Sequence, residues 1–322
     1  MNLKNTFLKL LTFREFAIFI VVIITLLIIS IGKPYFVSLN NLRIIIRSIS
    51  MEGLIVIGMT MVIVARGFDL SVGSMLGFSG VIVALLLHAN YGIFLSILLT
   101  LFAGFFIGLT NGLIITKIKV NPLITTLGMM TILRGGTLVL TEGSITQFPE
   151  SFTRWGQGAF FMDKPYELPY QIFIMVIFFI IGDILLRRTK FLRQLYYVGG
   201  NEKVSLLSGI NVDRIRMFTY IITSILASFA GILTTSRFNG ASISAGVGTE
   251  LKVIAAVIIG GGSLSGGEGT ILGGILGLAL VAFISAGLIA WGIDPDWEGV
   301  ISGAILIIAV AFDRLVKRKS LS

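Results

Sequence analysis

The sequence predicts an all-α membrane protein, a polytopic bundle of about ten transmembrane helices. Of its 322 residues, 55% are hydrophobic and only 13% are charged, and the mean hydropathy is +0.98. A soluble domain cannot bury that much apolar surface, so lipid must solvate much of the chain. Glycines recur at four-residue spacing, as in Gly104, Gly108 and Gly112, and this spacing lets helix backbones approach closely in a membrane.

Ten apolar runs predict the individual spans. A full crossing needs roughly 20 residues. The third, fifth and eighth runs are short, glycine-rich or interrupted, so they are read either as half-length helices or as full crossings. The predicted spans are 16–32, 44–65, 72–88, 92–115, 122–141, 170–187, 217–236, 250–261, 270–291 and 298–314.

The distribution of charge predicts the topology of this single transmembrane domain, residues 1–322. The run from Phe16 to Ile31 imitates a signal peptide, but no small-residue cleavage site follows it, so we interpret it as an uncleaved first span. With the N-terminus inside, the cytoplasmic segments hold 17 of the 25 Lys and Arg residues. Cytoplasmic loops of membrane proteins are enriched in these residues, so both termini are expected on the cytoplasmic side.

Two polar segments are long enough to bind something, an external one near 142–169 and a cytoplasmic one near 188–216. The cytoplasmic segment contains Tyr197-Val-Gly-Gly-Asn-Glu-Lys-Val-Ser-Leu-Leu-Ser-Gly. Asn201 is suited to cap a short helix, and Gly209 stands where a left-handed stop is expected. A short helix held against the inner face predicts a docking element for a soluble partner.

Composition excludes several classes of protein. The absence of cysteine excludes disulfides and thiol chemistry, and a single histidine, His88, argues against a histidine metal site. We therefore expect no metal and no cofactor. The net charge is +9, but the basic residues lie in short loops and at both ends of the chain, as membrane topology requires. This distribution argues against a nucleic-acid-binding surface.

Two glycine-containing motifs interrupt apolar runs. The first, Arg66-Gly-Phe-Asp-Leu-Ser-Val-Gly-Ser, is read either as a broken helix lining a translocation path or as a tight turn in which Arg66 and Asp69 pair. The second, Gly260-Gly-Gly-Ser-Leu-Ser-Gly-Gly-Glu-Gly, lacks the lysine of a phosphate-binding loop. The two motifs resemble each other, which predicts an internal repeat whose copies run parallel in the charge-based topology.

Polar side chains within the spans are candidates for the path of a polar solute, because such groups are costly in lipid. The candidates are Asp69, Ser71, Asn111, Thr125 and Arg134. A proton-coupled carrier would need a buried carboxylate of raised pKa, and Glu52 is the one plausible candidate.

At these residues the chain resembles the permease subunits of bacterial ABC importers for ribose, arabinose, xylose and related sugars, which also include autoinducer permeases. The matching stretches follow the family order: Gly67–Ser74, Asn111-Gly-Leu, Thr126-Leu-Gly with Arg134-Gly, Tyr197-x-Gly-Gly-Asn with Ser208-Gly-Ile, Ala230-Gly-Ile, Ile254-Ala-Ala, Gly260–Gly269 and Asp313-Arg.

The resemblance implies a subunit without catalysis of its own. Two permease copies, identical or related, would form one pore, each would dock an ATP-binding subunit, and an extracytoplasmic binding protein would deliver the sugar. The segment 199–210 is similar to the family's coupling loop. The residues expected to transmit movement of the ATPase are Gly199, Gly200, Asn201, Glu202, Ser208 and Gly209.

The leading hypothesis is therefore an inner-membrane permease subunit that moves a monosaccharide or a similar small polyol, with energy from a separate ATPase. The alternative is an ion-coupled secondary transporter of a small polar solute, which would need coupling carboxylates rather than a docking helix. A membrane-embedded enzyme would need an acidic or histidine cluster near the inner interface, and the sequence shows none. The sequence leaves open which sugar is carried.

Overall fold

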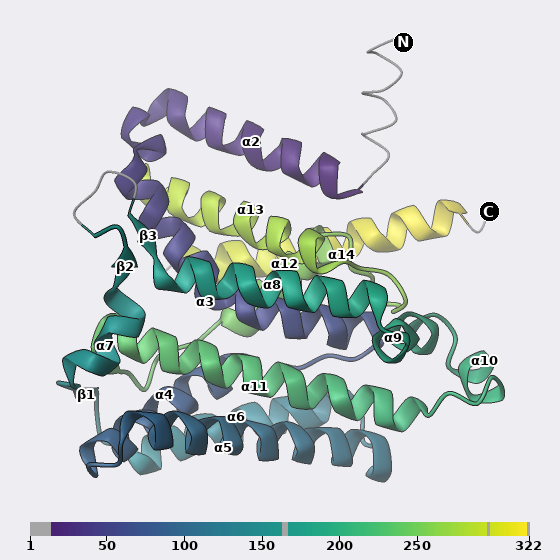
Figure 1. The fold of residues 1–322 in the computed structure, drawn as a ribbon. Helices are drawn as coiled ribbons and strands as arrows, with labels where there is room; N and C mark the ends of the chain where they lie inside the picture. Colours follow the sequence, from purple (N-terminus) through teal and green to yellow (C-terminus); the bar gives the residue numbers. More distant parts are fainter. Residues whose placement is uncertain (1–13, 163–166, 295–296, 321–322) are drawn as a thin grey trace.

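The computed structural model describes residues 14–162, 167–294 and 297–320, which form a bundle of roughly aligned helices (Figure 1). In these ranges seven helices are long and apolar enough to cross a membrane. They are α2 (Arg14–Gly32), α3 (Leu39–Val64), α5 (Ile93–Leu113), α6 (Pro122–Leu140), α8 (Tyr170–Arg188), α11 (Val212–Phe238) and α13 (Ile271–Ala290). The predicted all-α polytopic fold is confirmed.

The remaining elements include the three other predicted spans and the connections at the two ends of the bundle. The spans are α4 (Val72–His88), α12 (Thr249–Ile259) and α14 (Trp297–Ser320). One end, here the strand end, carries η1 (Pro34–Val37), α7 (Glu150–Gln157) and the strand pairs. In these pairs β1 (Ile145–Thr146) lies against β4 (Gly240–Ala241), and β2 (Ala159–Phe160) against β3 (Leu168–Pro169), both antiparallel. The other end, the α10 end, carries the π-helical turn η2 (Ile114–Ile118), α9 (Lys190–Gly200) and α10 (Glu202–Leu207).

The centre of the bundle is the antiparallel pair α3 and α11. Gly58 of α3 faces Thr223 of α11, and the Thr234 hydroxyl of α11 lies 3.4 Å from the Met51 sulfur of α3. The two helices therefore run in opposite directions. A Cβ on Gly58 would stand too close to the Thr223 backbone, so glycine permits this approach. The outer helices α2, α5, α6 and α8 expose large apolar side chains, as a lipid-solvated surface requires.

Two helices are too short to cross the bundle, and both follow a segment that folds back into it. After α3 the chain turns at 65–71 and continues as α4, whose 17 residues extend about 26 Å. After α11 the segment 239–248 folds back and leads into α12, whose 11 residues extend about 17 Å. The two N-termini meet inside the bundle, where Gly73 lies against Gly246 and the Glu250 carboxylate. The fifth predicted span, α6, is a complete 19-residue helix.

The helix pairings describe an inverted repeat of α3–α6 and α11–α14. α11 packs on α5, and α3 packs correspondingly on α13. α4 runs toward the strand end, whereas α12 runs toward the α10 end. The parallel arrangement predicted from the two glycine motifs is therefore wrong. The segment equivalent to 65–71 is 239–248, because each follows a central helix and precedes a short one, whereas 260–270 follows the short helix α12.

The first motif is a fold-back segment rather than a simple turn. Asp69 is completely buried, whereas Arg66 is exposed with a positive φ of 63°. Within the described residues Arg66 forms no ion pair with Asp69, whose Oδ1 instead accepts a hydrogen bond from the Ser71 amide at 2.9 Å. The predicted Arg66–Asp69 pair is therefore absent from this part of the chain.

Candidate functional site

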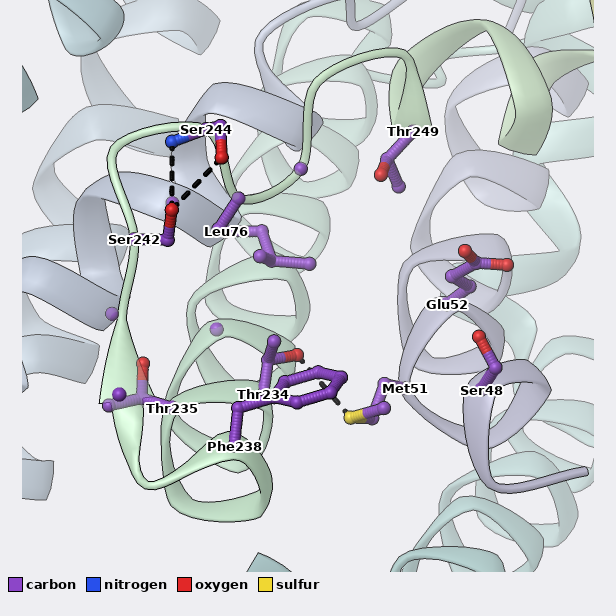
Figure 2. A pocket seen from close by; sticks show the side chains of 16 residues that line it. Ser48, Met51, Glu52, Leu76, Thr234, Thr235, Phe238, Ser242, Ser244 and Thr249 are labelled. Carbon is purple, nitrogen blue, oxygen red and sulfur yellow. Dashed lines mark hydrogen bonds between the residues drawn. The ribbon is translucent and has the colours of Figure 1, made fainter. Parts of the chain in front are cut away.

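A cavity of about 310 Å³ lies beside the fold-back segment 239–248 (Figure 2). It is enclosed by α3, α4, α11, the segment 239–248 and the first residue of α12. Hydroxyl groups dominate its polar lining: Ser48, Thr234, Thr235, Ser242, Ser244 and Thr249. The Phe238 ring and Met51 form an apolar side of the same cavity (Figure 2). Such a lining offers many hydrogen-bond donors and acceptors beside an apolar wall.

An ion pair joins the cavity wall to α12. Glu52 of α3 lines the cavity, and its Oε1 accepts a hydrogen bond from Lys252 Nζ at 3.0 Å. The two side chains are only 16% and 9% exposed, so each charge needs the other in this apolar environment. The second carboxylate oxygen, Oε2, has no hydrogen-bond partner among the described residues. It therefore remains available as an acceptor.

Arg134 of α6 fixes the fold-back segment that lines the cavity. Its Nη1 donates hydrogen bonds to the carbonyl oxygens of Ile243 at 3.3 Å and Ala245 at 2.9 Å. Gly246 and Gly248 follow with φ of 75° and 79°, left-handed values that glycine adopts at little cost. Arg134 thus holds a part of the cavity wall in place without lining the cavity itself.

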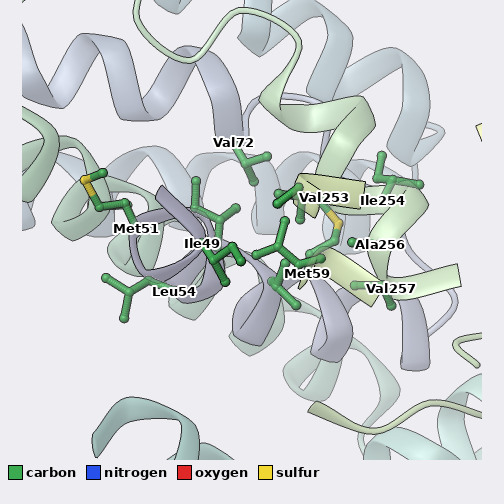
Figure 3. Packing of buried hydrophobic residues seen from close by; sticks show 14 of the residues in the cluster. Ile49, Met51, Leu54, Met59, Val72, Val253, Ile254, Ala256 and Val257 are labelled. Carbon is green, nitrogen blue, oxygen red and sulfur yellow. The ribbon is translucent and has the colours of Figure 1, made fainter. Parts of the chain in front are cut away.

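A buried apolar cluster packs α3 against the two short helices (Figure 3). Met59 of α3, Val72 of α4 and Val253 and Val257 of α12 belong to one buried cluster. This packing joins both short helices to the central helix, so a shift of either one moves residues of the cavity wall.

Three other predicted path residues lie together in a buried cluster at the first fold-back segment. The Ser71 hydroxyl donates to Asp69 Oδ1 at 2.5 Å, and Asn111 Nδ2 of α5 donates to the Ser71 hydroxyl oxygen at 3.1 Å. The Tyr220 hydroxyl donates to the Phe68 carbonyl at 3.3 Å. These contacts fix the start of α4 to α5 and α11. None of the three predicted residues lines the cavity just described.

Thr125 lies apart from that cluster, in the first turn of α6. Its hydroxyl donates to the Asn121 carbonyl at 3.1 Å. The structure thus brings Asp69, Ser71 and Asn111 together and leaves Thr125 and Arg134 on α6.

The α10 end presents a small helix that is capped at both ends. The Asn201 side chain accepts a hydrogen bond from the Val204 amide at 3.1 Å, and Gly209 has a φ of 77°. The predicted cap and the predicted left-handed stop are both confirmed. Ser208 is the last residue before that stop. Leu207, on the outer surface of α10, is 88% exposed.

Contacts behind α10 connect it to the end of α3 and to the segment that links α12 to α13. Glu202 Oε2 accepts a hydrogen bond from Arg216 Nη2 at 2.8 Å, and Arg216 Nε donates to the Ala65 carbonyl at 3.4 Å. Gly199 is pressed against Val64 O and Gly267 N, which are themselves hydrogen-bonded at 2.8 Å. One junction therefore touches both α3–α4 and the segment that links α12 to α13.

Tyr196 of α9 adds a second link to that segment. Its hydroxyl donates to the Gly269 carbonyl at 2.9 Å. Burial raises the pKa of the Tyr196 phenol, so the hydroxyl keeps the proton that it donates.

Comparison with known proteins identifies the class of this membrane protein. Residues 41–310 match the family described as the permease component of branched-chain amino acid transport systems. The chain belongs to this permease family. The permease is 39% identical to the ribose import permease protein of Bacillus subtilis, over 92% of this chain and 91% of the relative. No solved structure matches it.

Two further relatives extend the comparison over nearly the whole permease. It is 35% identical to the galactose/methyl galactoside import permease protein of Escherichia coli K12, over 97% of each chain. It is 32% identical to the L-arabinose ABC transporter permease protein of Azospirillum brasilense, over 92% of this chain and 86% of the relative. The apolar helices indicate a multi-pass membrane protein, and the relatives indicate that its role is transport.

Sequence reasoning missed the hydroxyl groups that line the cavity of this permease. Ser242, Ser244 and Thr249 lie in Gly240-Ala-Ser-Ile-Ser-Ala-Gly-Val-Gly-Thr, a serine- and glycine-rich stretch between two apolar runs. A polar, glycine-rich interruption next to a span of only 11 residues is the signal that could have found them.

Proposed function

We propose that this permease is the membrane subunit of an ATP-driven importer that moves a monosaccharide or a similar small polyol. The observation that carries the proposal is the hydroxyl-lined cavity at the meeting point of the two short helices. Discontinuous helices often surround the binding site of a transporter, because their ends expose backbone groups inside the membrane. The relatives named for ribose, galactose and arabinose support the same class of solute.

The chemistry of the cavity suits a neutral, hydroxyl-rich solute. Serine and threonine hydroxyls both donate and accept, so they can replace water around sugar hydroxyls without a change of protonation. The Phe238 ring offers an apolar surface to the C–H face of a sugar ring. Within this proposal the solute passes the cavity, while Asp69, Ser71, Asn111, Thr125 and Arg134 remain candidates further along the path or behind its wall.

Energy would come from a separate ATPase docked at the α10 end. α10 exposes three apolar side chains close together, Val204, Leu206 and Leu207, and a partner that covers this patch explains their exposure. Gly199, Gly200, Asn201, Glu202, Ser208 and Gly209 would transmit the movement of this partner, since they build α10 and the junction behind it. The permease itself would carry out no catalysis.

The complete importer would contain further partners in a bacterial inner membrane. The α10 end is assigned to the cytoplasm because most Lys and Arg residues belong to its segments, which also places both termini there. An extracytoplasmic sugar-binding protein would then dock at the strand end. A second permease copy, identical or related, would complete the pore.

The alternative, an ion-coupled carrier, has less support. Its best coupling carboxylate, Glu52, already has a cationic partner in Lys252 at 3.0 Å, whereas a coupling site needs a carboxylate that is open to the transported ion.

Docking of an ATPase is tested by gentle affinity purification of the permease from its native membrane. The wild-type protein is expected to retain an ATP-binding subunit, and Leu207→Asp is expected to lose it. The matched control is Met162→Asp, which alters an exposed apolar residue at the strand end. Recovery of no ATPase with the wild-type protein under several mild conditions would contradict the proposal and turn attention to Glu52.

The class of solute is tested by uptake of labelled ribose, galactose and arabinose into proteoliposomes that contain the purified importer. Thr249→Ile places an apolar side chain in the cavity and is expected to lower uptake at least tenfold, because a buried sugar hydroxyl loses its partner. Thr110→Ile, on the exposed surface of α5, should transport normally. Equal uptake by the two variants would remove the cavity from the path.

A further inference from the structure

A second concave site lies away from the proposed path, on the outer surface of the bundle at the strand end. It is a groove of about 420 Å³ between α7 and the first turns of α8. α7 contributes Ser151, Arg154 and Trp155, which share one face because they are three and four residues apart. α8 contributes Phe173, Ile174 and Ile177 by the same spacing. Nothing in the proposed transport of a solute uses this groove.

The groove opens onto a surface that lipid solvates. Phe173, Ile177, Ile180 and Ile184 form an exposed apolar stripe along α8, one of the seven helices suited to cross the membrane. In a bilayer, acyl chains solvate an exposed apolar stripe of this kind. Because Phe173 and Ile177 belong to both the stripe and the groove, acyl chains have direct access to the groove.

The position of the groove along α8 places it at the boundary of the bilayer. The 19 residues of α8 extend about 29 Å, close to the roughly 30 Å thickness of the hydrocarbon core. The groove occupies the first two turns, so it lies just inside that boundary. Trp155, which is 54% exposed at the rim, is a residue type that concentrates at this depth.

Arg154 provides a charge where a lipid headgroup would lie. Its side chain is exposed at the rim, and within the described part of the chain no carboxylate pairs with it. A guanidinium presents a planar pair of donors that matches two phosphate oxygens. The site therefore combines an apolar groove below the boundary with a phosphate-binding cation at it.

Contacts within the protein hold both walls of the groove. The Ser236 hydroxyl of α11 donates to the Phe152 carbonyl at 2.7 Å, and Gly156 lies so close to Ser236 and Arg237 that no Cβ would fit. On the α8 side the Phe160 ring packs edge-on against Tyr170 at 4.7 Å and Phe173 at 5.3 Å between centroids. A groove that is formed before its ligand binds lowers the entropy cost of binding a flexible chain.

We propose that this groove binds one membrane phospholipid, with an acyl chain between α7 and α8 and its phosphate on Arg154. Such a lipid holds α7 against α8. α7 also packs on α11, next to the fold-back segment 239–248. The inference does not depend on the solute or on the ATPase, since it rests only on groups that face the bilayer.

The test is native mass spectrometry of the detergent-purified protein titrated with phosphatidylglycerol. The wild-type protein is expected to retain one lipid molecule after the annular lipids dissociate. Arg154→Gln should weaken this binding about tenfold, the loss expected for a charge-assisted hydrogen bond, and Arg154→Lys, which keeps the charge without the planar pair of donors, should weaken it less. The matched control is Arg188→Gln, which removes an exposed arginine from the opposite end of α8 and should bind as the wild type does.

A second variant tests the apolar part of the groove. Ile177→Trp fills the groove from its exposed edge and should abolish retention of the lipid, while gel filtration confirms an intact, monodisperse protein. If Arg154→Gln and Arg188→Gln behave alike, the bound lipid is annular only and the proposal fails. Retention of phosphatidylglycerol by the folded Ile177→Trp protein would overturn it equally.

Discussion

Two neighbouring glycines, Gly199 and Gly200, are equivalent in sequence but not in structure. Gly199 lies against Val64 O and Gly267 N with no room for a Cβ, whereas a Cβ on Gly200 would meet open space. We predict that Gly199→Ala destabilises the protein by about 1–3 kcal/mol, because the backbones must separate. Gly200→Ala should change stability by less than about 1 kcal/mol. Thermal unfolding in detergent measures both.

Equal midpoints for the two glycine variants would mean that the α9–α3 contact is not close-packed in the membrane. In the proposed importer, the same two variants separate docking of the ATPase from transmission of its movement. Transport should fall with Gly199→Ala while the ATPase still co-purifies, because α10 itself is unaltered.

The Glu52–Lys252 pair gives a second prediction at the level of single residues. Glu52→Gln leaves the Lys252 ammonium in a largely buried position without its carboxylate, which should cost about 3–5 kcal/mol. Combining it with Lys252→Met removes the charge and should restore most of the stability, since burial of an ion pair itself carries a desolvation cost. If chemical unfolding shows the double variant to be no better than Glu52→Gln, the charge pair is not what holds α12 to α3.

Residues with local roles could be predicted from sequence, and residues with distant partners could not. Asn201 and Gly209 act on amides and torsions within a few positions, so their types alone indicated a capped helix. Glu52 and Lys252 are 200 residues apart, and nothing near either residue indicates the other. Arg134 was found because it is charged within a span, but its backbone partners at Ile243 and Ala245 depend on the fold.

At the level of elements, the junction between α10, α11 and the end of α3 predicts how movement would be transmitted. Arg216 holds Glu202 of α10 on one side and the Ala65 carbonyl on the other. We predict that Arg216→Gln still binds the ATPase, because Leu207 is unchanged, but loses transport at least tenfold. The partly exposed ion pair contributes only about 0–1 kcal/mol, so unfolding should not explain the loss.

The control for this prediction is Arg214→Gln, two residues earlier on the same helix. Arg214 is exposed, and its guanidinium lies over the Phe191 ring of α9 at 5.9 Å. ATP hydrolysis and sugar uptake are measured on the same proteoliposomes. Normal uptake per ATP hydrolysed by Arg216→Gln would show that movement passes through another contact, such as Tyr196 and Gly269.

The elements themselves were largely predictable because lipid requires long apolar runs. Each of the ten predicted spans coincides with a helix, within a few residues at most ends. The predicted direction of the repeat was wrong because it relied on a short glycine and serine similarity between 66–74 and 260–269. The order of helices along the chain shows instead that 239–248 is the segment equivalent to 65–71. α7 and the strand pairs were not predicted, because their stability comes from packing on α11 and on one another rather than from periodicity.

At the level of the whole molecule, the assignment of the two ends to the two sides of the membrane is directly testable. The chain contains no cysteine, so a single introduced thiol is a unique label. Lys203→Cys on α10 should react with a membrane-impermeant maleimide only in inverted vesicles, and Met162→Cys only in right-side-out vesicles. The opposite pattern would reverse the topology and place the proposed ATPase site outside the cell.

The meeting of α4 and α12 inside the bundle has a consequence for synthesis of the protein. In the first half alone, α3–α6, the Phe68 carbonyl would lack the hydrogen bond from Tyr220. Arg134 and Glu52 would likewise lack their partners Ala245 and Lys252 from the second half. Lipid cannot satisfy these groups. The early spans must therefore remain beside the insertion machinery, or in contact with water, until α11 and α12 leave the ribosome. Biogenesis of this chain is thus expected to be cooperative across its two halves rather than helix by helix.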